Sequence, residues 1–209
     1  ISIDDLKTPS LTIRFKLLYH IKNPSAIKLL KGGIFVDLKR WQIIGAVFAL
    51  IMGALLHFTY EWSGENPVVG IFSAVNESTW EHLKLLFVPV ALFAALEYIG
   101  YGKQIPNFVP VKVLSILLGM ITIIIAYYTY THIVGQNYLW VDIGIFILGV
   151  LAAYWFSYSF LQTEFLASEC AVCLGWAGLL LLAFSFAFFT FCPPHVELFL
   201  DPVTGTYGR

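Results

Sequence analysis

Five runs of about 20 mainly apolar residues make up most of this chain and limit its fold more than any other feature. A helix rises about 1.5 Å per residue, so each run can cross the roughly 30 Å of hydrocarbon in a bilayer. In lipid the backbone must satisfy its own hydrogen bonds, and a run of this length does so as a helix. Charged residues occupy only 12% of the 209 positions, too few to cover a soluble domain. We therefore predict an all-α, polytopic membrane helix bundle with five transmembrane helices.

Short connections with turn-forming residues separate the predicted spans. The spans cover residues 41–60, 79–101, 111–134, 140–161 and 171–191. Pro89 lies inside the second span and predicts a kink there. Neither an internal repeat nor a second domain is visible in the sequence, so we expect one transmembrane domain over residues 38–209.

The first 40 residues differ from the rest because they hold eight of the twelve Lys and Arg. Apolar residues are interleaved with these cations, and Asn23-Pro24-Ser25 favours a turn followed by the start of a helix. We expect residues 1–37 to form a basic amphipathic segment that lies along an anionic membrane surface. A cytoplasmic lead-in without a fixed position is the alternative.

The basic residues also predict how the chain is oriented. Lys103 and Lys112 flank the connection between the second and third spans, whereas the connections after the first and third spans contain no Lys or Arg. Cytoplasmic loops of membrane proteins are enriched in Lys and Arg. We therefore expect a multi-pass plasma-membrane protein whose N-terminus is cytoplasmic and whose C-terminus is extracytoplasmic.

This orientation places most of the histidines and several acidic residues on the outer side of the membrane. His57 and Glu61 lie at the outer end of the first span, and their i, i+4 spacing puts both side chains on one stripe of a helix. The second span opens with Asn-Glu-Ser-Thr-Trp-Glu-His at residues 76–82. The remaining members of the outer set are His132, Asp142 and His195.

Imidazole and carboxylate groups on neighbouring helices are usual ligands of Zn, Fe or Mn. We expect a divalent metal such as Zn to be bound by His57, Glu77, His82 and His195. The predicted catalytic groups are Glu61, Glu77 and His82, and the other pocket residues are Asn76, Glu81, His132 and Asp142. A proton relay, in which a His and a Glu exchange a proton near neutral pH, fits the same residues.

Part of the 76–82 motif has a purely structural explanation. Ser78-Thr79-Trp80-Glu81 matches a capping box, in which the Ser78 side chain caps the helix and the Glu81 carboxylate returns to the N–H of the cap. This pattern explains Ser78 and Glu81 without any chemistry. It requires neither Glu77 nor His82, which therefore remain the stronger site candidates.

The last residues of the chain favour an ordered path. Residues 193–208 contain three prolines together with turn-forming pairs such as Asp201-Pro202 and Thr204-Gly205. We expect this segment to fold back over the outer face and to cover the His and Glu cluster. A tail that simply lies in the membrane interface is the alternative.

Several motifs together resemble a family of bacterial multi-pass membrane proteins of unknown function. They are the 76–82 motif, His-Phe-Thr-Tyr-Glu-Trp at 57–62, Pro-Pro-His at 193–195 and Asp-Pro-Val-Thr-Gly-Thr-Tyr-Gly at 201–208. The resemblance covers residues 38–208 and leaves residues 1–37 outside it. It implies a bacterial plasma-membrane location and supplies no catalytic residues.

Three functions fit these observations. The first is a metal-dependent or acid–base enzyme, such as a hydrolase that acts on a lipid or another amphiphile at the outer leaflet. The second is a protein that binds or transports a small solute or an ion. The third is a non-catalytic subunit of a membrane complex, with another membrane protein or a second copy of the chain as partner. The formal net charge of −1 gives no indication of nucleic-acid binding.

Overall fold

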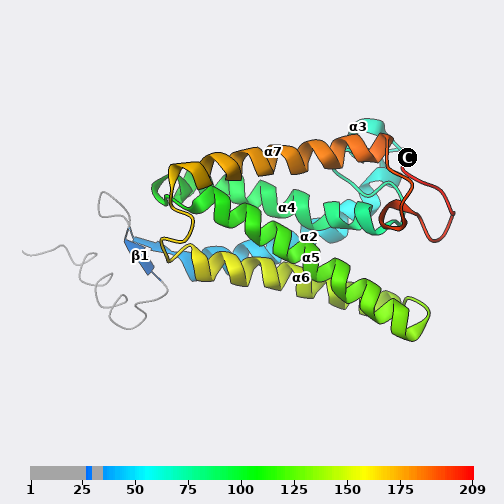
Figure 1. The fold of residues 1–209 in the computed structure, drawn as a ribbon, viewed down its shortest axis with the longest axis horizontal. Helices are drawn as coiled ribbons and strands as arrows, with labels where there is room; N and C mark the ends of the chain where they lie inside the picture. Colours follow the sequence, from blue (N-terminus) through cyan, green and yellow to red (C-terminus); the bar gives the residue numbers. More distant parts are fainter. Residues whose placement is uncertain (1–26, 30–34) are drawn as a thin grey trace, which may run out of the picture.

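Each of the five apolar runs forms one long helix in the computed structural model, which describes residues 27–29 and 35–209 (Figure 1). These helices are α2 (Leu38–Trp62), α4 (Thr79–Gly100), α5 (Phe108–Val134), α6 (Leu139–Phe160) and α7 (Glu169–Phe191). All five are long and apolar enough to cross a membrane. The predicted all-α membrane bundle is therefore confirmed.

Side-chain caps at the helix starts explain where several helices begin. The Asp37 carboxylate accepts a hydrogen bond from the N–H of Arg40 at the start of α2. The hydroxyl groups of Ser78 and Ser168 do the same at the starts of α4 and α7. Each cap satisfies a backbone donor that has no partner within the helix. At its other end, α5 stops at Gly135, whose φ of 82° suits glycine.

Two short strands precede the bundle. Strand β1 (Ile27–Leu29) pairs antiparallel with β2 (Phe35–Asp37), and β2 leads directly into α2. The helix expected after residues 23–25 is therefore wrong for residues 27–29, because their backbone pairs with the neighbouring strand. The rest of the expected amphipathic segment, residues 1–26 and 30–34, lies outside the described residues.

Glycines allow two pairs of helices to approach closely. A Cβ on Gly119 of α5 would lie 2.8 Å from the carbonyl oxygen of Gly149 on α6. A Cβ on Gly53 of α2 would lie 2.6 Å from the carbonyl oxygen of Leu85 on α4. Small residues at such crossings are a common device for packing helices in membranes. Between the helices lies an apolar core that includes Leu83, Leu86, Phe93, Ile116, Val150 and Phe186.

The connectivity of the bundle separates two ends (Figure 1). One end, named the site end here, carries the connection from α2 to α4, the turn from α5 to α6, and the tail, residues 192–209. The short helix α3 (Pro67–Gly70) and the 3-10 turn η3 (Glu197–Phe199) also lie there. The opposite end carries the start of α2 and the 3-10 turn η2 (Gly102–Gln104), between α4 and α5.

A buried ion pair joins α4 and α5 near the opposite end. Lys112 Nζ lies 2.5 Å from Glu97 Oε2, and both side chains are buried. The other Glu97 oxygen accepts hydrogen bonds from the Gln42 side chain and from the Tyr101 hydroxyl, both at 2.6 Å. The ionised groups thus have partners from three segments, as charged groups at this depth require.

Candidate metal centre

Three predicted site residues converge at the site end. The ligand atoms of His57, Glu77 and His82 all lie within 4.8 Å of one another. His82 Nε2 lies 3.4 Å from Glu77 Oε2, and His57 Nε2 lies 3.9 Å from Glu77 Oε1. Ligand atoms bound at 2.0–2.2 Å to a tetrahedral Zn²⁺ lie about 3.4 Å apart, so small movements would bring this group to a metal-binding geometry.

The close approach of α2 and α4 sets the two imidazoles side by side. Gly53 lies one turn before His57 on α2, and Leu85 lies one turn after His82 on α4. Because Gly53 has no side chain, the two helices meet at this level. The ring centroids of His57 and His82 are consequently only 5.2 Å apart.

Hydrogen bonding fixes the tautomer of one histidine. His82 Nδ1 lies 2.9 Å from the carbonyl oxygen of Ser78, which can only accept, so Nδ1 carries the proton. A neutral His82 then directs the lone pair of Nε2 toward the Glu77 carboxylate. Two lone pairs that face each other at 3.4 Å need a cation or a proton between them. A ring nitrogen that donates to a carbonyl is also the usual arrangement for a metal-bound histidine.

Glu77 belongs to a loop rather than to a helix. The Glu77 loop, residues 71–78, joins α3 to α4, and Glu77 comes just before the cap residue Ser78. Glu77 and Glu81 are four residues apart, but they do not share a helix stripe because α4 begins only at Thr79. The Ser73 hydroxyl instead ties the loop to α2, by hydrogen bonds with the Thr59 hydroxyl at 2.9 Å and the Tyr60 N–H at 3.1 Å.

The capping box is only half formed. The Ser78 hydroxyl accepts from the N–H of Glu81 at 3.3 Å, as predicted. The Glu81 carboxylate, however, accepts from the N–H of Val75 at 3.0 Å. The N–H of Ser78 donates to the Asn76 side chain at 2.9 Å instead. The predicted return of Glu81 to the cap is therefore wrong, because Asn76 occupies that position and Glu81 is drawn into the bundle.

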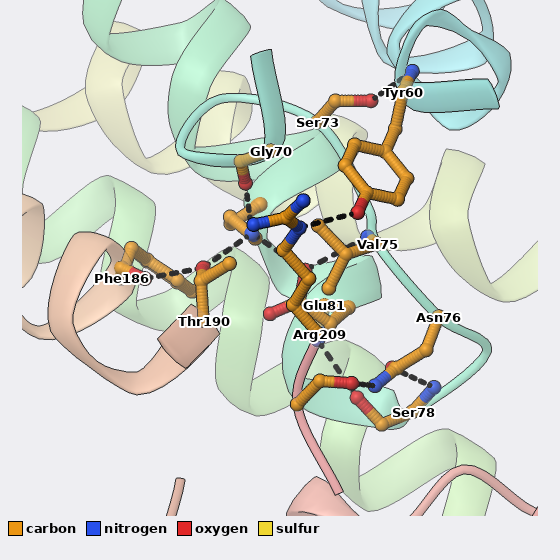
Figure 2. A network of polar contacts seen from close by, with 12 residues as sticks. Tyr60, Gly70, Ser73, Val75, Asn76, Ser78, Glu81, Phe186, Thr190 and Arg209 are labelled. Carbon is orange, nitrogen blue, oxygen red and sulfur yellow. Dashed lines mark hydrogen bonds and ion pairs between the residues drawn. The ribbon is translucent and has the colours of Figure 1, made fainter. Parts of the chain in front are cut away.

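A buried lysine draws Glu81 inward. Lys84 Nζ lies 2.5 Å from Glu81 Oε2, 2.8 Å from the carbonyl oxygen of Gly70 and 2.7 Å from the Thr190 hydroxyl. Lys84 and Thr190 are 0% exposed, and Glu81 is 1% exposed. Figure 2 shows Gly70, Thr190 and Glu81 gathered at one place, next to the loop residue Val75.

The tail contacts the same loop from the other side. The Asn76 side chain donates to the carbonyl oxygen of Gly208 at 2.9 Å. The Arg209 guanidinium donates to the Tyr60 hydroxyl at 2.8 Å and to the Glu65 carbonyl at 3.2 Å. A hollow of about 590 Å³ lies between these segments. Its lining includes Tyr60, Glu65, Asn76, Glu77, Phe191, Asp201, Val203, Thr204, Thr206 and Arg209.

Asp201 holds the turn of the tail in place. Burial alone would raise its pKa, but hydrogen bonds to its carboxylate outweigh that effect and keep the pKa of Asp201 below its ordinary value. The donors are the Thr204 hydroxyl and the N–H groups of Val203, Thr204 and Glu77. The bond from Glu77 connects the tail directly to the backbone of the candidate ligand.

The other predicted residues lie outside the group of three. Glu61 is exposed near the end of α2, and His132 is exposed in the last turn of α5. His195 stacks on the ring of Tyr207 with 4.6 Å between centroids. The Asp142 carboxylate accepts a hydrogen bond from the Tyr130 hydroxyl at 2.7 Å, which ties together the turn from α5 to α6. Asn76 and Glu81 support the loop that carries Glu77.

Sequence reasoning missed the lysine network beneath the site. Lys84 is a single cation inside an apolar run, three residues after Glu81, and this spacing is a signal for an ion pair on one helix. Nothing in the sequence marks Thr190 as part of this network, since a threonine near a helix end is common in any span. Its part depends on the packing of α7 against α4, which local spacing does not encode.

The donor set suits a divalent transition metal. Two imidazoles and one carboxylate are frequent zinc ligands, and such a set of three leaves a fourth position for water or substrate. The side chains are 30%, 49% and 35% exposed for His57, Glu77 and His82, so the group is open to solvent.

Comparison with known proteins gives a family. Residues 31–209 match a family described as "Family of unknown function (DUF6512)". No curated protein and no solved structure matches the chain. The expected resemblance to a family of unknown function is thus confirmed, and the matched region begins at residue 31 rather than at residue 38.

Proposed function

Since the chain belongs to the family of unknown function DUF6512, which brings no activity with it, we propose from the site alone that this protein is a metal-dependent hydrolase of the membrane surface. His57, Glu77 and His82 bind one divalent metal, with Zn²⁺ as the best fit to the ligands. The substrate is a lipid or another amphiphile whose polar end reaches the site end of the bundle.

One observation carries the proposal. The three donors come from α2, the Glu77 loop and α4, and yet their ligand atoms lie within 4.8 Å of one another. The bond from His82 Nδ1 to Ser78 leaves Nε2 as a free electron-pair donor directed at this point. A carboxylate and two imidazole nitrogens, gathered by three segments, are the features expected of a metal centre.

The metal supplies the chemistry that the side chains lack. A divalent metal held by His57, Glu77 and His82 would lower the pKa of a bound water and so supply hydroxide near neutral pH. In ester hydrolysis the oxygen of that water would end on the carbonyl or phosphoryl centre. The bond to the leaving oxygen would break, and the leaving oxygen would take up the proton. Water is the only co-reactant.

The hollow beside the metal centre supports an amphiphilic substrate. Glu77 lines the hollow, so a ligand held there would lie next to the metal. Tyr60, Asn76 and Arg209 offer polar contacts, whereas Phe191 and Val203 offer apolar ones. The site end is where the spans would leave the membrane. The hollow there fits the polar head group of an amphiphile whose apolar chain remains in the bilayer.

The charge distribution supports an outward-facing site. Among the described residues, the exposed cations Lys39, Arg40 and Lys103 lie at the opposite end, whereas the site end has one exposed cation, Arg209, and the buried Lys84. Basic residues favour the cytoplasmic side. We therefore propose that the site end faces away from the cytoplasm of a plasma membrane and that the substrate comes from the outer leaflet.

Metal analysis of the purified full-length protein tests the proposal. The wild type should contain close to one Zn, Fe or Mn per chain and should rebind one Zn²⁺ after chelation. His82→Ala should lose this metal, and His195→Ala should retain it, since His195 stacks on Tyr207 away from the group. A wild type that neither contains nor rebinds metal would overturn the proposal and leave the proton relay as the remaining use of these groups.

A further inference from the structure

A lysine without solvent contact follows the candidate ligand His82 by two residues on α4. Lys84 is fully buried in α4, and its ammonium group has acceptors from three segments: Gly70 of α3, Glu81 of α4 and Thr190 of α7. An ionised side chain in a membrane span is costly unless it is paired and hydrogen-bonded, and such residues commonly have a functional reason.

The network reaches the Glu77 loop through one carboxylate oxygen. Glu81 Oε2 accepts both from Lys84 Nζ at 2.5 Å and from the N–H of Val75 at 3.0 Å. Val75 precedes the candidate ligand Glu77 by two residues. Lys84 also holds the carbonyl of Gly70, the last residue of α3, at the other end of the loop. One ammonium group thus fixes the start of the loop directly and its middle through Glu81 (Figure 2).

We propose that Lys84 and Glu81 are positioning residues of the metal centre, which fix the Glu77 loop so that the Glu77 carboxylate faces both histidines. The inference rests on the proposed metal binding. Neither Lys84 nor Glu81 belongs to the group of three ligand atoms that lie within 4.8 Å of one another, and Lys84 instead binds Gly70, Glu81 and Thr190. Their effect passes through Val75, and the backbone of the loop transmits it to Glu77.

The chain contains a matched control for this role. Lys112 and Glu97 form a second buried pair with the same 2.5 Å separation, and Glu97 lies on α4 like Glu81. This pair lies near the opposite end of the bundle, where it binds Gln42 and Tyr101. Breaking either pair leaves a buried charge without its partner, so both changes should destabilise the fold, but only one should change the metal centre.

The experiment compares Lys84→Met with Lys112→Met in the full chain in detergent. Zn²⁺ affinity is measured by competition with a chromophoric chelator, and hydrogen exchange of residues 71–78 is measured by mass spectrometry. Lys84→Met should raise the Kd for Zn²⁺ by about 10-fold or more, as changes to supporting residues of metal sites do, and should speed exchange in the loop. Lys112→Met should lower the Tm and leave both the Kd and the loop exchange near the wild-type values.

Three further variants keep the test decisive. Glu81→Gln retains an acceptor for Val75 and should weaken Zn²⁺ binding less than Glu81→Ala. Should Lys84→Met not fold, Thr190→Val removes one acceptor of Lys84 at nearly constant volume and should also raise the Kd. Equal Kd values in the Lys84 and Lys112 variants would overturn the positioning role. A wild type without metal affinity would overturn the proposed function instead, and loop exchange would still report whether Lys84 holds the loop.

Discussion

Gly53 and Leu85 meet so closely that a Cβ on Gly53 would lie 2.6 Å from the Leu85 carbonyl oxygen. This crossing of α2 and α4 lies one helical turn inside the two histidines. The distance between α2 and α4 at this crossing determines how far the imidazole of His57 lies from that of His82. The two ring centroids are 5.2 Å apart. A glycine that offers no ligand atom itself therefore controls the geometry of the candidate centre.

Gly53→Ala should separate the histidines and weaken metal binding. The added methyl group would also lie 2.5 Å from the Phe146 ring, so the helices must move apart or the ring must shift. Overpacking of this kind costs about 1–3 kcal/mol of stability. We expect a lower Tm and a higher Kd for Zn²⁺. Gly144→Ala is the matched control, because no atom lies within 4 Å of its added Cβ. A Kd that is the same in both variants would contradict this reasoning.

The sequence predicted the fold well because the signals for membrane helices are local. Apolar length identified all five spans, and cap residues such as Ser78 marked helix starts to within a few residues. The strand at residues 27–29 was missed, since it forms only by pairing with residues 35–37 and this pairing depends on contacts between segments. Local pattern is enough for a helix, whose hydrogen bonds are internal, but not for a strand.

The candidate site was predicted in part, for a reason that its residues make clear. The predicted orientation of the spans placed His57, Glu77 and His82 on the same side of the membrane, and the structure brings these three residues together. The same argument also selected Glu61 and His195, which lie outside the group of three. The predicted orientation of the spans gives the side of the membrane on which a residue lies, but it does not say toward which neighbours the side chain points. The role of Lys84 was not seen, as its acceptors come from three segments that only tertiary packing brings together.

The docking of the tail should depend on pH through Asp201. Its folded pKa lies below the ordinary value of 3.8, so the ionised form is the one that stabilises the docked tail. This stabilisation is complete above the ordinary pKa and is lost as the pH falls through the lower, folded value. We expect slow hydrogen exchange in residues 196–208 from pH 7 to about pH 5, once intrinsic rates are corrected, and faster exchange below about pH 4.

Asp201→Asn separates this effect from general acid unfolding. The amide cannot take up the proton, so the variant should lose the acid-dependent step in the tail and should exchange faster than the wild type already at neutral pH. The N–H groups of Val203 and Thr204 should lose protection as well, because Asp201 is their acceptor. Identical exchange profiles of the variant and the wild type would show that Asp201 does not hold the tail.

The buried pair near the opposite end should matter for stability as a unit. Lys112→Met leaves Glu97 buried without its cation and should destabilise the protein by about 3–5 kcal/mol. The double variant Glu97→Gln with Lys112→Met removes both charges and keeps an acceptor for Gln42 and Tyr101. It should recover a large part of the loss in thermal unfolding. A double variant as unstable as the single one would show that the hydrogen bonds, rather than the charge balance, hold this region.

The native cysteines can test the proposed orientation without new labels. Cys192 is exposed at the site end, and Cys170 and Cys173 are exposed at the opposite end, at the start of α7. If the site end faces outward, a membrane-impermeant maleimide added to intact cells should label a variant that retains only Cys192. Variants that retain only Cys170 or only Cys173 should react after permeabilisation alone. The reverse pattern would place the histidines in the cytoplasm and would turn the substrate from an outer-leaflet amphiphile into an inner one, while the geometry of the metal centre would stay the same.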